Sequence, residues 1–393
     1  MALRLIPGAL PPGLAPPVRE ALALFDEPAL AEALAFHRSL PEYRPTPLVP
    51  LPGLARRLGI RALLVKDESP RFGLGSVKAL GSSVALHKLK GSFAGTAGEG
   101  GPVFVTATDG NHGKGLAWAA ARLGCPAEIF MPAGSSPARV EAIRRINQTP
   151  VTLTDGNYME TVRAARRRVE DQNGGGLESG PYYLVQDTGF PGYQRTPGYV
   201  CRGYGTLAGE TWAQLEEAGV PRPSHVFLQA GVGSLAAAVL ACLLNRWPEN
   251  PPAVIIVEPQ EAACVFESVL AGGSEPVAVE GSPKTLMAGL NCGEVNPFLW
   301  PLLRDRGSFF AAVPDEITIR GMKLLARPFP GDPALVSGES GAVGTGLLAA
   351  LALDPALGEE KKALGLDSSS VALVFSTEGA TDPESYRRIL ETP

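Results

Sequence analysis

Short apolar segments alternate along this chain with longer segments whose apolar residues recur at a helical spacing. The short segments are rich in valine, isoleucine and phenylalanine and are bounded by glycine, proline or aspartate. Apolar runs of this kind predict buried β-strands. The predicted strands cover residues 62–68, 102–108, 127–132, 151–156, 182–188, 225–231, 253–259 and 371–377.

Amphipathic or alanine-rich segments between several of these strands predict helices. They cover residues 112–124, 136–148, 159–172 and 235–247. Strands that alternate with helices are typical of parallel sheets with helices on both faces, so the predicted fold class is α/β. The strands fall into two groups, which predict a small domain of residues 90–200 and a large domain of residues 1–89 and 201–393. The glycine-rich segment 90–101 is the expected first crossing between them.

Composition limits the possible classes of function. The chain has 393 residues, of which 45% are hydrophobic, so it is long enough to bury a substantial core. Its formal charge of -5 is spread along the chain without a basic block, which argues against nucleic acid or an anionic membrane surface as a partner. No apolar run approaches the ~18 residues of a membrane span, and prolines interrupt the apolar start. We therefore predict a soluble, cytoplasmic protein.

The five cysteines are odd in number, widely spaced and embedded in apolar segments. This pattern predicts reduced, buried thiols. Neither the cysteines nor the four scattered histidines have the spacing of a zinc site, so no metal is expected.

Three loops that directly follow predicted strands carry candidate chemistry, because ligands of open parallel sheets bind beyond the carboxyl ends of the strands. The first loop, Gly231-Val232-Gly233-Ser234, runs into an alanine-rich helix. Its glycines and the unpaired N–H groups of a helix start suit a phosphate group. A tight turn that only packs the helix on the strand would use the same residues. Together with Glu258, the loop also fits a dinucleotide fingerprint, so an NAD-binding protein is an alternative.

The other two loops are rich in polar side chains. Residues 106–115 include Thr108, Asp109, Asn111 and His112 at a predicted helix start, a set that suits a substrate carboxylate. A turn that only caps the helix would use similar residues. Ser376 and Thr377 place hydroxyl groups at the end of the last predicted strand, where such residues are more often caps or turn formers.

Two lysines lie in the segment VKDESPRFGLGSVKALG, residues 65–81. Lys66 lies in a strand pattern beside two acids, where an ion-paired or partly buried structural lysine is the simplest interpretation. Lys78 follows a glycine-rich approach and begins a helical segment. The positive end of a helix and apolar neighbours are expected to lower its pKa, as an imine-forming amine requires. A surface lysine is the alternative for Lys78.

Eight motifs, in this order, give the chain a specific resemblance over about residues 40–390. They are KDESPRFGLGSVKALG, ATDGNHGKG, LVQDTGFPGY, GYGTLAGE, QAGVGS, TLMAGLNCGE, SGESGAVG and STEGATDP. The combination resembles the diaminopropionate ammonia-lyases, a branch of the tryptophan synthase β-like, fold type II enzymes that use pyridoxal phosphate. The resemblance implies two open parallel-sheet domains with the active site between them, and a homodimer. It also implies α,β-elimination of 2,3-diaminopropionate, as the D or the L form or both, to pyruvate and two molecules of ammonia.

The resemblance also implies roles for individual cofactor-binding residues. Lys78 corresponds to the lysine that forms a Schiff base with the cofactor, and Gly231-Val232-Gly233-Ser234 to the loop that binds its phosphate. Asn111 corresponds to the asparagine that hydrogen-bonds the phenolic oxygen. The hydroxyl group that meets the pyridine nitrogen is matched by Ser376, with Thr377 as the second choice.

Asp109 is the most diagnostic residue of the resemblance. Related serine and threonine dehydratases have a Ser-x-Gly-Asn-His pattern here, whereas a carboxylate at the x position is characteristic of the ammonia-lyase branch. There it is linked to removal of the Cα proton from one substrate enantiomer, and Asp187 matches the acid associated with the opposite enantiomer. Thr108 and His112 flank Asp109 and are the other expected substrate-binding residues.

The chain departs from the family pattern in two places. Residues 75–77 are Gly-Ser-Val, where an asparagine-containing run that ends in an aromatic residue is usual, and residues 189–191 are Gly-Phe-Pro, where a bulkier, tryptophan-like residue is usual. Both changes concern the walls of the pocket and leave the enantiomer preference and the exact substrate open. A serine or threonine dehydratase, or another β-eliminating enzyme of this fold, is the alternative within the family. A non-catalytic NAD-binding sensor is the alternative outside it.

Overall fold

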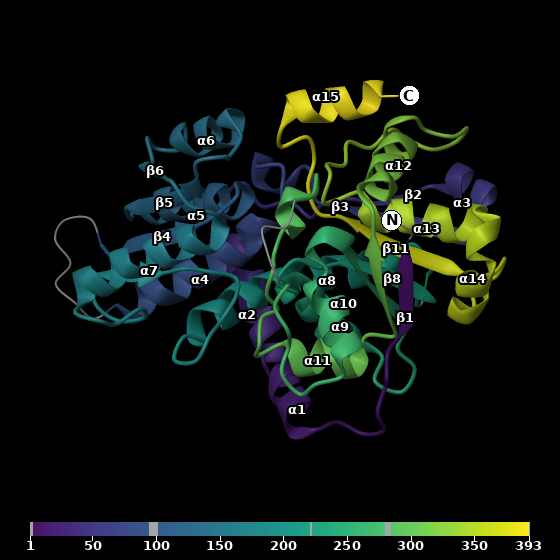
Figure 1. Cartoon of the computed structure of the whole chain (residues 1–393), viewed down its shortest axis with the longest axis horizontal. Coiled ribbons are helices and arrows are strands. Elements are labelled where there is room, and N and C mark those ends of the chain that lie inside the picture. Colours follow the sequence, from purple (N-terminus) through teal and green to yellow (C-terminus); the bar gives the residue numbers. More distant parts are fainter. Residues whose placement is uncertain (1–2, 94–100, 221, 280–283, 393) are drawn as a thin grey trace.

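The computed structural model describes residues 3–93, 101–220, 222–279 and 284–392. The chain forms two mainly parallel sheets with helices packed against them (Figure 1). The α/β fold class predicted from the sequence is therefore confirmed. Most of segment 90–101, the expected crossing between the two groups of strands, lies outside the described residues.

The larger sheet has seven strands. They are β1 (Arg4–Pro7), β2 (Leu48–Pro50), β3 (Ala62–Asp67), β8 (His225–Gln229), β9 (Ala253–Pro259), β10 (Phe309–Val313) and β11 (Val371–Ser376). Their order is β1-β10-β9-β8-β11-β3-β2, with β1 and β2 antiparallel at the two edges and the five inner strands parallel. Val374 of β11 pairs with Phe227 of β8. The loops that follow β8 and β11 therefore leave the same edge side by side.

The smaller sheet has four parallel strands, which lie at the left of Figure 1. They are β4 (Val103–Ala107), β5 (Ala127–Pro132), β6 (Val151–Thr154) and β7 (Tyr182–Leu184). Their order is β6-β5-β4-β7. All four come from the middle of the chain, and the larger sheet is built from the segments before and after them. The domain boundaries at residues 90 and 200 stay a prediction.

Helices connect the strands and cover the sheets. They are α1 (Pro16–Ala23), α2 (Glu27–Ser39), α3 (Pro52–Leu58), α4 (Lys78–Ser92), α5 (Asn111–Leu123), α6 (Pro137–Arg144), α7 (Tyr158–Asn173), α8 (Arg195–Glu217), α9 (Ser234–Arg246), α10 (Cys264–Ala271), α11 (Trp300–Arg306), α12 (Asp315–Ala326), α13 (Val343–Leu353), α14 (Gly358–Leu364) and α15 (Pro383–Glu391). None of the helices in the described ranges is both long and apolar enough to cross a membrane.

The inner strands are buried on both faces, which explains why their sequences are continuous apolar runs. Val226 and Leu228 of β8 pack into the core that contains α8 and α9, whereas Phe227 between them packs towards α12 and α13. In the smaller sheet, Phe104 faces the core that contains α5 and α6, and Val105 faces α7. Alternate residues of a strand point to opposite faces, so both sets must be apolar when helices cover both sides.

The helix α4, which begins at Lys78, is fixed by close packing against α5 and α8. Gly203 of α8 lies so close to α4 that a Cβ atom there would overlap the carbonyl oxygen of Leu80. A Cβ atom on Gly81 would lie 2.8 Å from the carbonyl oxygen of Val200. These glycines let the two backbones approach, and the crossing holds the start of α4 between the two sheets.

All eight predicted strands are present, and three observed strands were not predicted. The unpredicted strands are β1, β2 and β10. The first two are short antiparallel edge strands that end in proline, and β10 has the sequence FFAAV, with little of the β-branched content that marks a strand.

Candidate active site

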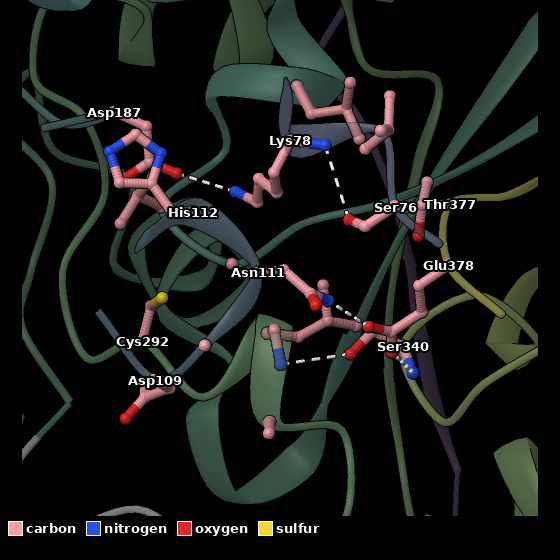
Figure 2. A pocket seen from close by; sticks show the side chains of 18 of the residues that line it. Ser76, Lys78, Asp109, Asn111, His112, Asp187, Cys292, Ser340, Thr377 and Glu378 are labelled. Atoms are coloured by element: carbon pink, nitrogen blue, oxygen red, sulfur yellow. Dashed lines mark hydrogen bonds and ion pairs between the residues drawn. The ribbon is translucent and has the colours of Figure 1, made fainter. Parts of the chain in front are cut away.

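One cavity gathers loops from both sheets at the carboxyl ends of their strands. Its walls contain nearly all of the site residues predicted from the sequence: Lys78, Thr108, Asp109, Asn111, His112, Asp187, Gly231, Val232, Gly233, Ser234 and Thr377. Figure 2 shows several of these side chains around the shared space. Segments more than 250 residues apart in sequence, such as those of Asn111 and Glu378, meet here through a direct hydrogen bond.

Ser376 is the one predicted site residue that the structure does not bring to the cavity. Its hydroxyl group donates to Ser337 Oγ at 2.8 Å, and its side chain is buried away from the cavity walls. Thr377, the next residue, lines the cavity, and its Oγ1 accepts a hydrogen bond from Gln229 Nε2 at 3.0 Å. Successive residues at the end of a strand point to opposite sides, so only one of the two hydroxyl groups can face a ligand here.

Lys78 is the first residue of α4, and its side chain meets Asp187 (Figure 2). Its Nζ lies 2.6 Å from Asp187 Oδ2. Burial works to lower the pKa of Lys78, but the carboxylate of Asp187 outweighs it, and the pKa is raised above the usual value. The sequence-based expectation of a lowered pKa is therefore wrong, because it considered the helix end and not a carboxylate more than 100 residues away.

Asp187 remains ionised in spite of its burial. Burial raises its pKa, but the charge of Lys78 and its hydrogen bond lower it more, and the pKa falls to about 2. The backbone carbonyl of Asp187 accepts a hydrogen bond from Ser234 Oγ, and Ser234 Oγ in turn accepts one from Asn296 Nδ2 at 2.9 Å. The acid that pairs with Lys78 is thus fixed to the start of α9.

Asp109 differs from Asp187 in its surroundings. It lies in the turn between β4 and α5, where burial raises its pKa to about 6, and Arg139 limits the rise. The turn is held by Thr108, whose Oγ1 accepts hydrogen bonds from Gly110 N at 2.9 Å and Gly113 N at 3.1 Å. A carboxylate with a pKa near 6 is ionised at neutral pH and can still accept a proton, which suits a general base.

His112 is held as a neutral ring next to this turn. Its Nε2 donates to the carbonyl oxygen of Val185 at 2.9 Å, which leaves Nδ1 as an acceptor. Burial lowers the pKa of His112, with a further contribution from Lys78 and against the effect of Asp187. Nδ1 is buried and has no partner within the described part of the chain, so the ring offers an unused acceptor.

The glycine-rich loop after β8 allows other groups to come close to its backbone. Gly233 has a φ of +85°, and a Cβ atom on Gly231 would lie 3.0 Å from Cys292 Sγ and 3.2 Å from the carbonyl oxygen of Gly289. Ser234 begins α9, and the first N–H groups of a helix have no partner within the helix. These groups, on a loop that lines the cavity, suit an anion such as a phosphate.

Glu258 does not serve this loop as a ribose-binding acid. It is buried at the end of β9 and is not part of the cavity wall. Its carboxyl oxygens accept hydrogen bonds from Val265 N at 2.9 Å and Phe266 N at 2.7 Å, which caps the start of α10. Burial raises the pKa of Glu258 to about 8. The acid that supported the NAD-binding alternative is therefore engaged elsewhere.

Lys66 lies outside the cavity and is ion-paired, as expected, but its partner is Glu210 of α8 and not one of the two acids beside it, and its side chain is fully buried. Its Nζ lies 2.8 Å from Glu210 Oε2 and donates to the carbonyl oxygen of Thr46 at 2.7 Å. Arg71 pairs with the same Glu210 at 2.8 Å and with Glu68 at 2.8 Å. These buried ion pairs fix the segment between β3 and α4, which leads to Lys78.

Several cavity residues have no counterpart in the sequence-based prediction. They are Arg139, Tyr158, Gln229, Cys292, Ser340 and Glu378. Four of them, Gln229, Cys292, Ser340 and Glu378, fall within motifs that carried the resemblance, but none of these residue types signals a role by itself. Burial raises the pKa of Cys292 to about 12, so its thiol stays protonated. Within the described ranges, no group of His, Cys, Asp and Glu side chains could hold a metal ion.

Known proteins resemble this chain in sequence and in structure. A family model described as "Pyridoxal-phosphate dependent enzyme" matches residues 40–368. The diaminopropionate ammonia-lyase of Salmonella typhimurium is 42% identical over 390 residues, which cover 94% of this chain and 94% of the relative. A crystal structure of the Escherichia coli diaminopropionate ammonia-lyase, in complex with an aminoacrylate-PLP azomethine reaction intermediate, superimposes with a TM-score of 0.88. It is 39% identical and covers 99% of this chain and 97% of that chain.

A similarity to threonine dehydratases is more limited. The biosynthetic L-threonine dehydratase of E. coli is 31% identical over 234 residues, which cover 58% of this chain and 38% of that enzyme. The similarity to the ammonia-lyases thus extends over nearly the whole chain, and the similarity to this dehydratase over little more than half of it.

Proposed function

This chain belongs to the family of pyridoxal-phosphate dependent enzymes, and we propose that it eliminates ammonia from 2,3-diaminopropionate, as the D or the L form or both, to give pyruvate and two molecules of ammonia. The observation that carries the proposal is one cavity lined by Lys78, by the Gly231–Ser234 loop and by two carboxylates, Asp109 and Asp187. The lysine and the loop fit the cofactor. The carboxylates fit a substrate that brings two amino groups.

The chain offers a partner for each polar part of pyridoxal phosphate. Lys78 Nζ would bind the aldehyde, the N–H groups of the Gly231–Ser234 loop the phosphate, and the Asn111 amide the phenolic oxygen. We assign the contact with the pyridine nitrogen to Thr377, because its hydroxyl group lines the cavity and that of Ser376 does not. When bound, the cofactor supplies an electrophilic carbon and a ring that takes up electron density from the substrate's Cα.

The substrate carboxylate fits the start of α5. Of the first amide groups of this helix, that of Gly113 is already bonded to Thr108 Oγ1, which leaves the N–H groups of Asn111 and His112 for a ligand. A carboxylate at this helix start also meets the positive end of the helix dipole. Binding there places the rest of the substrate next to Asp109, in the same turn.

The two carboxylates have different roles in proton transfer because their pKa values differ. Asp109, with a pKa of about 6, can accept the Cα proton as a general base at neutral pH. Asp187, with a pKa of about 2, keeps its negative charge and holds a proton on Lys78 Nζ. An amine is a poor leaving group unless it carries a proton. A charged carboxylate therefore assists by favouring the ammonium form of the departing group.

Steady-state rates on both enantiomers of diaminopropionate, serine and threonine test the proposed substrate. We expect kcat/KM for one or both diaminopropionates to exceed that for either serine or threonine by ~10²-fold or more, since buried carboxylates favour an ammonium over a hydroxyl group. A higher kcat/KM for serine or threonine would instead identify a dehydratase.

Asp187→Asn is expected to reduce turnover of the enantiomer that Asp109 does not serve, by ~10²-fold or more, because Lys78 Nζ loses the charged partner that controls its proton on that side of the substrate. The Gly231–Ser234 loop and Asn111 are unchanged, so bound cofactor should be retained. The measurement is kcat on D- and on L-diaminopropionate separately. Equal losses on the two enantiomers would contradict a role specific to one of them.

The homodimer and the cytoplasmic location belong to the same proposal. The first is supported by the resemblance of the eight motifs, and the second by the composition of the chain.

A further inference from the structure

Glu378 is a buried carboxylate in the cavity wall to which neither the sequence nor the proposed chemistry assigns a role. It follows Thr377 directly after β11, and 4% of its surface is exposed. Its Oε1 accepts a hydrogen bond from Ser340 N at 2.8 Å, and its Oε2 accepts one from Asn111 Nδ2 (Figure 2). Each carboxylate oxygen thus has one fixed donor.

The backbone around Glu378 is fixed to the segment that leads to Lys78. Glu378 and Ser76 form an antiparallel bridge, in which Val77 N donates to Thr377 O at 3.0 Å and Gly379 N donates to Gly75 O at 2.9 Å. On its other side, Gly338 N donates to Glu378 O at 2.9 Å. The carboxylate is therefore presented to Asn111 from a backbone that cannot turn freely.

We propose that Glu378 is a positioning residue that sets the orientation of the Asn111 amide. Both oxygens of this carboxylate accept hydrogen bonds from N–H groups, so it pairs with the NH₂ group of Asn111 and not with the amide oxygen. One N–H of Asn111 Nδ2 is then engaged, and the second remains to donate to the phenolic oxygen of the cofactor. This inference rests on the proposed function for the contact between Asn111 and the cofactor.

The reversed amide is disfavoured at this position. With Oδ1 in the place of Nδ2, the Asn111 oxygen would face the Glu378 carboxylate, and two acceptors would meet without a hydrogen in a buried site. Hydrogen bonds to a charged acceptor are also stronger than those between neutral groups. Glu378 thereby keeps an N–H donor, rather than an oxygen, turned towards an anionic phenolic oxygen.

Glu378→Gln tests this orientation without changing the shape of the side chain. The Gln oxygen can accept from Ser340 N, which leaves its NH₂ group facing Asn111. Two donors then meet, so the Asn111 amide turns over and presents Oδ1. We expect the Kd of the cofactor-free protein for pyridoxal phosphate, measured by fluorescence titration, to rise on the order of tenfold, which corresponds to about 1.4 kcal/mol.

A double-mutant cycle separates positioning from general stability. In an Asn111→Ala background, where no amide is left to orient, Glu378→Gln should change the Kd by less than about twofold. Glu339→Gln is the matched control, because Glu339 is a neighbouring buried acid that accepts from Ser385 Oγ at 2.8 Å and does not line the cavity. It should leave the Kd unchanged. The melting temperature of each cofactor-free variant is measured in parallel.

Additive effects of Glu378→Gln and Asn111→Ala on the Kd, or a lowered melting temperature with an unchanged Kd, would overturn the proposal while leaving the proposed function intact. A wild-type protein that takes up no pyridoxal phosphate would overturn both. If Glu378→Gln does not fold, Glu378→Asp serves instead. Its carboxylate is charged but too short to reach Asn111, and the same rise in Kd is expected, again lost in the Asn111→Ala background.

Discussion

Lys78→Ala is expected to reduce turnover of diaminopropionate by roughly 10³-fold or more and to remove the visible absorbance of covalently bound cofactor. Among the described residues that line the cavity, Lys78 is the one lysine, so no other amine is placed to replace it. The phosphate-binding loop is untouched, and the variant should therefore still bind pyridoxal phosphate non-covalently. Absorbance spectra before and after addition of diaminopropionate, with single-turnover and steady-state rates, measure both effects.

Lys88→Ala provides the matched control for this variant. Lys88 lies on the same helix, α4, but at the surface, where it pairs with Glu32. Surface ion pairs contribute little to stability, so this variant should keep the spectrum and the rate of the wild type. A Lys78→Ala protein that retains the wild-type spectrum and rate would show that the cofactor is bound by another amine.

The sequence alone predicted those strands whose apolar residues distinguish them from the segments on either side. Strands such as β8 and β9 are buried on both faces, so their apolar runs stand out against the flanking turns. The edge strands β1 and β2 are short and β10 is rich in alanine, so their assignment depends on the neighbours with which they pair. Pairing is a property of the assembled sheet and has no local signature.

The sequence predicted which loops form the candidate site, but it did not predict the direction in which each side chain points. The carboxyl ends of parallel strands meet at one edge, which identified the loops after β4, β8 and β11. The sequence could not decide whether Ser376 or Thr377 faces the ligand. In a strand buried on both faces, the residues on both sides are apolar, so the sequence does not show which of them point to which side of the sheet. The tertiary contact between Asn111 and Glu378 had no signal either, because neither residue is unusual in its own segment.

The pKa of Lys78 could not be predicted from the sequence for a similar reason, because it depends on the tertiary contact with Asp187. A helix start predicts a lowered lysine pKa from local structure, but a carboxylate 2.6 Å away dominates over the partial charge of a helix end. The sign of a pKa shift in a cavity is therefore decided by which loops the fold brings together. The same holds for Asp109, whose raised pKa comes mainly from burial.

Asp109→Asn is expected to lower kcat on one enantiomer of diaminopropionate by ~10²-fold to 10⁴-fold and to leave the other enantiomer much less affected. Asparagine keeps the shape of the side chain and cannot accept a proton, so the loss reports the missing base. The turn around it is held by Thr108 and does not depend on the carboxylate, so bound cofactor should be retained. Rates on the separate D and L forms, with the absorbance spectrum, provide the measurement. Equal turnover of both forms, unchanged from wild type, would exclude this role for Asp109.

The pH dependence of the same reaction identifies the group that titrates. A base with a pKa of about 6 is protonated and inactive below that pH, so kcat/KM should rise with pH through about 6 and level off above it. Asp187, with a pKa of about 2, stays ionised over this range and adds no step. Asp109→Asn should lose the rise, whereas Asp171→Asn, an exposed acid on α7, should keep it. Any titration of the substrate itself is common to all three proteins, so a rise that persists in Asp109→Asn would assign the step to the substrate or to another residue.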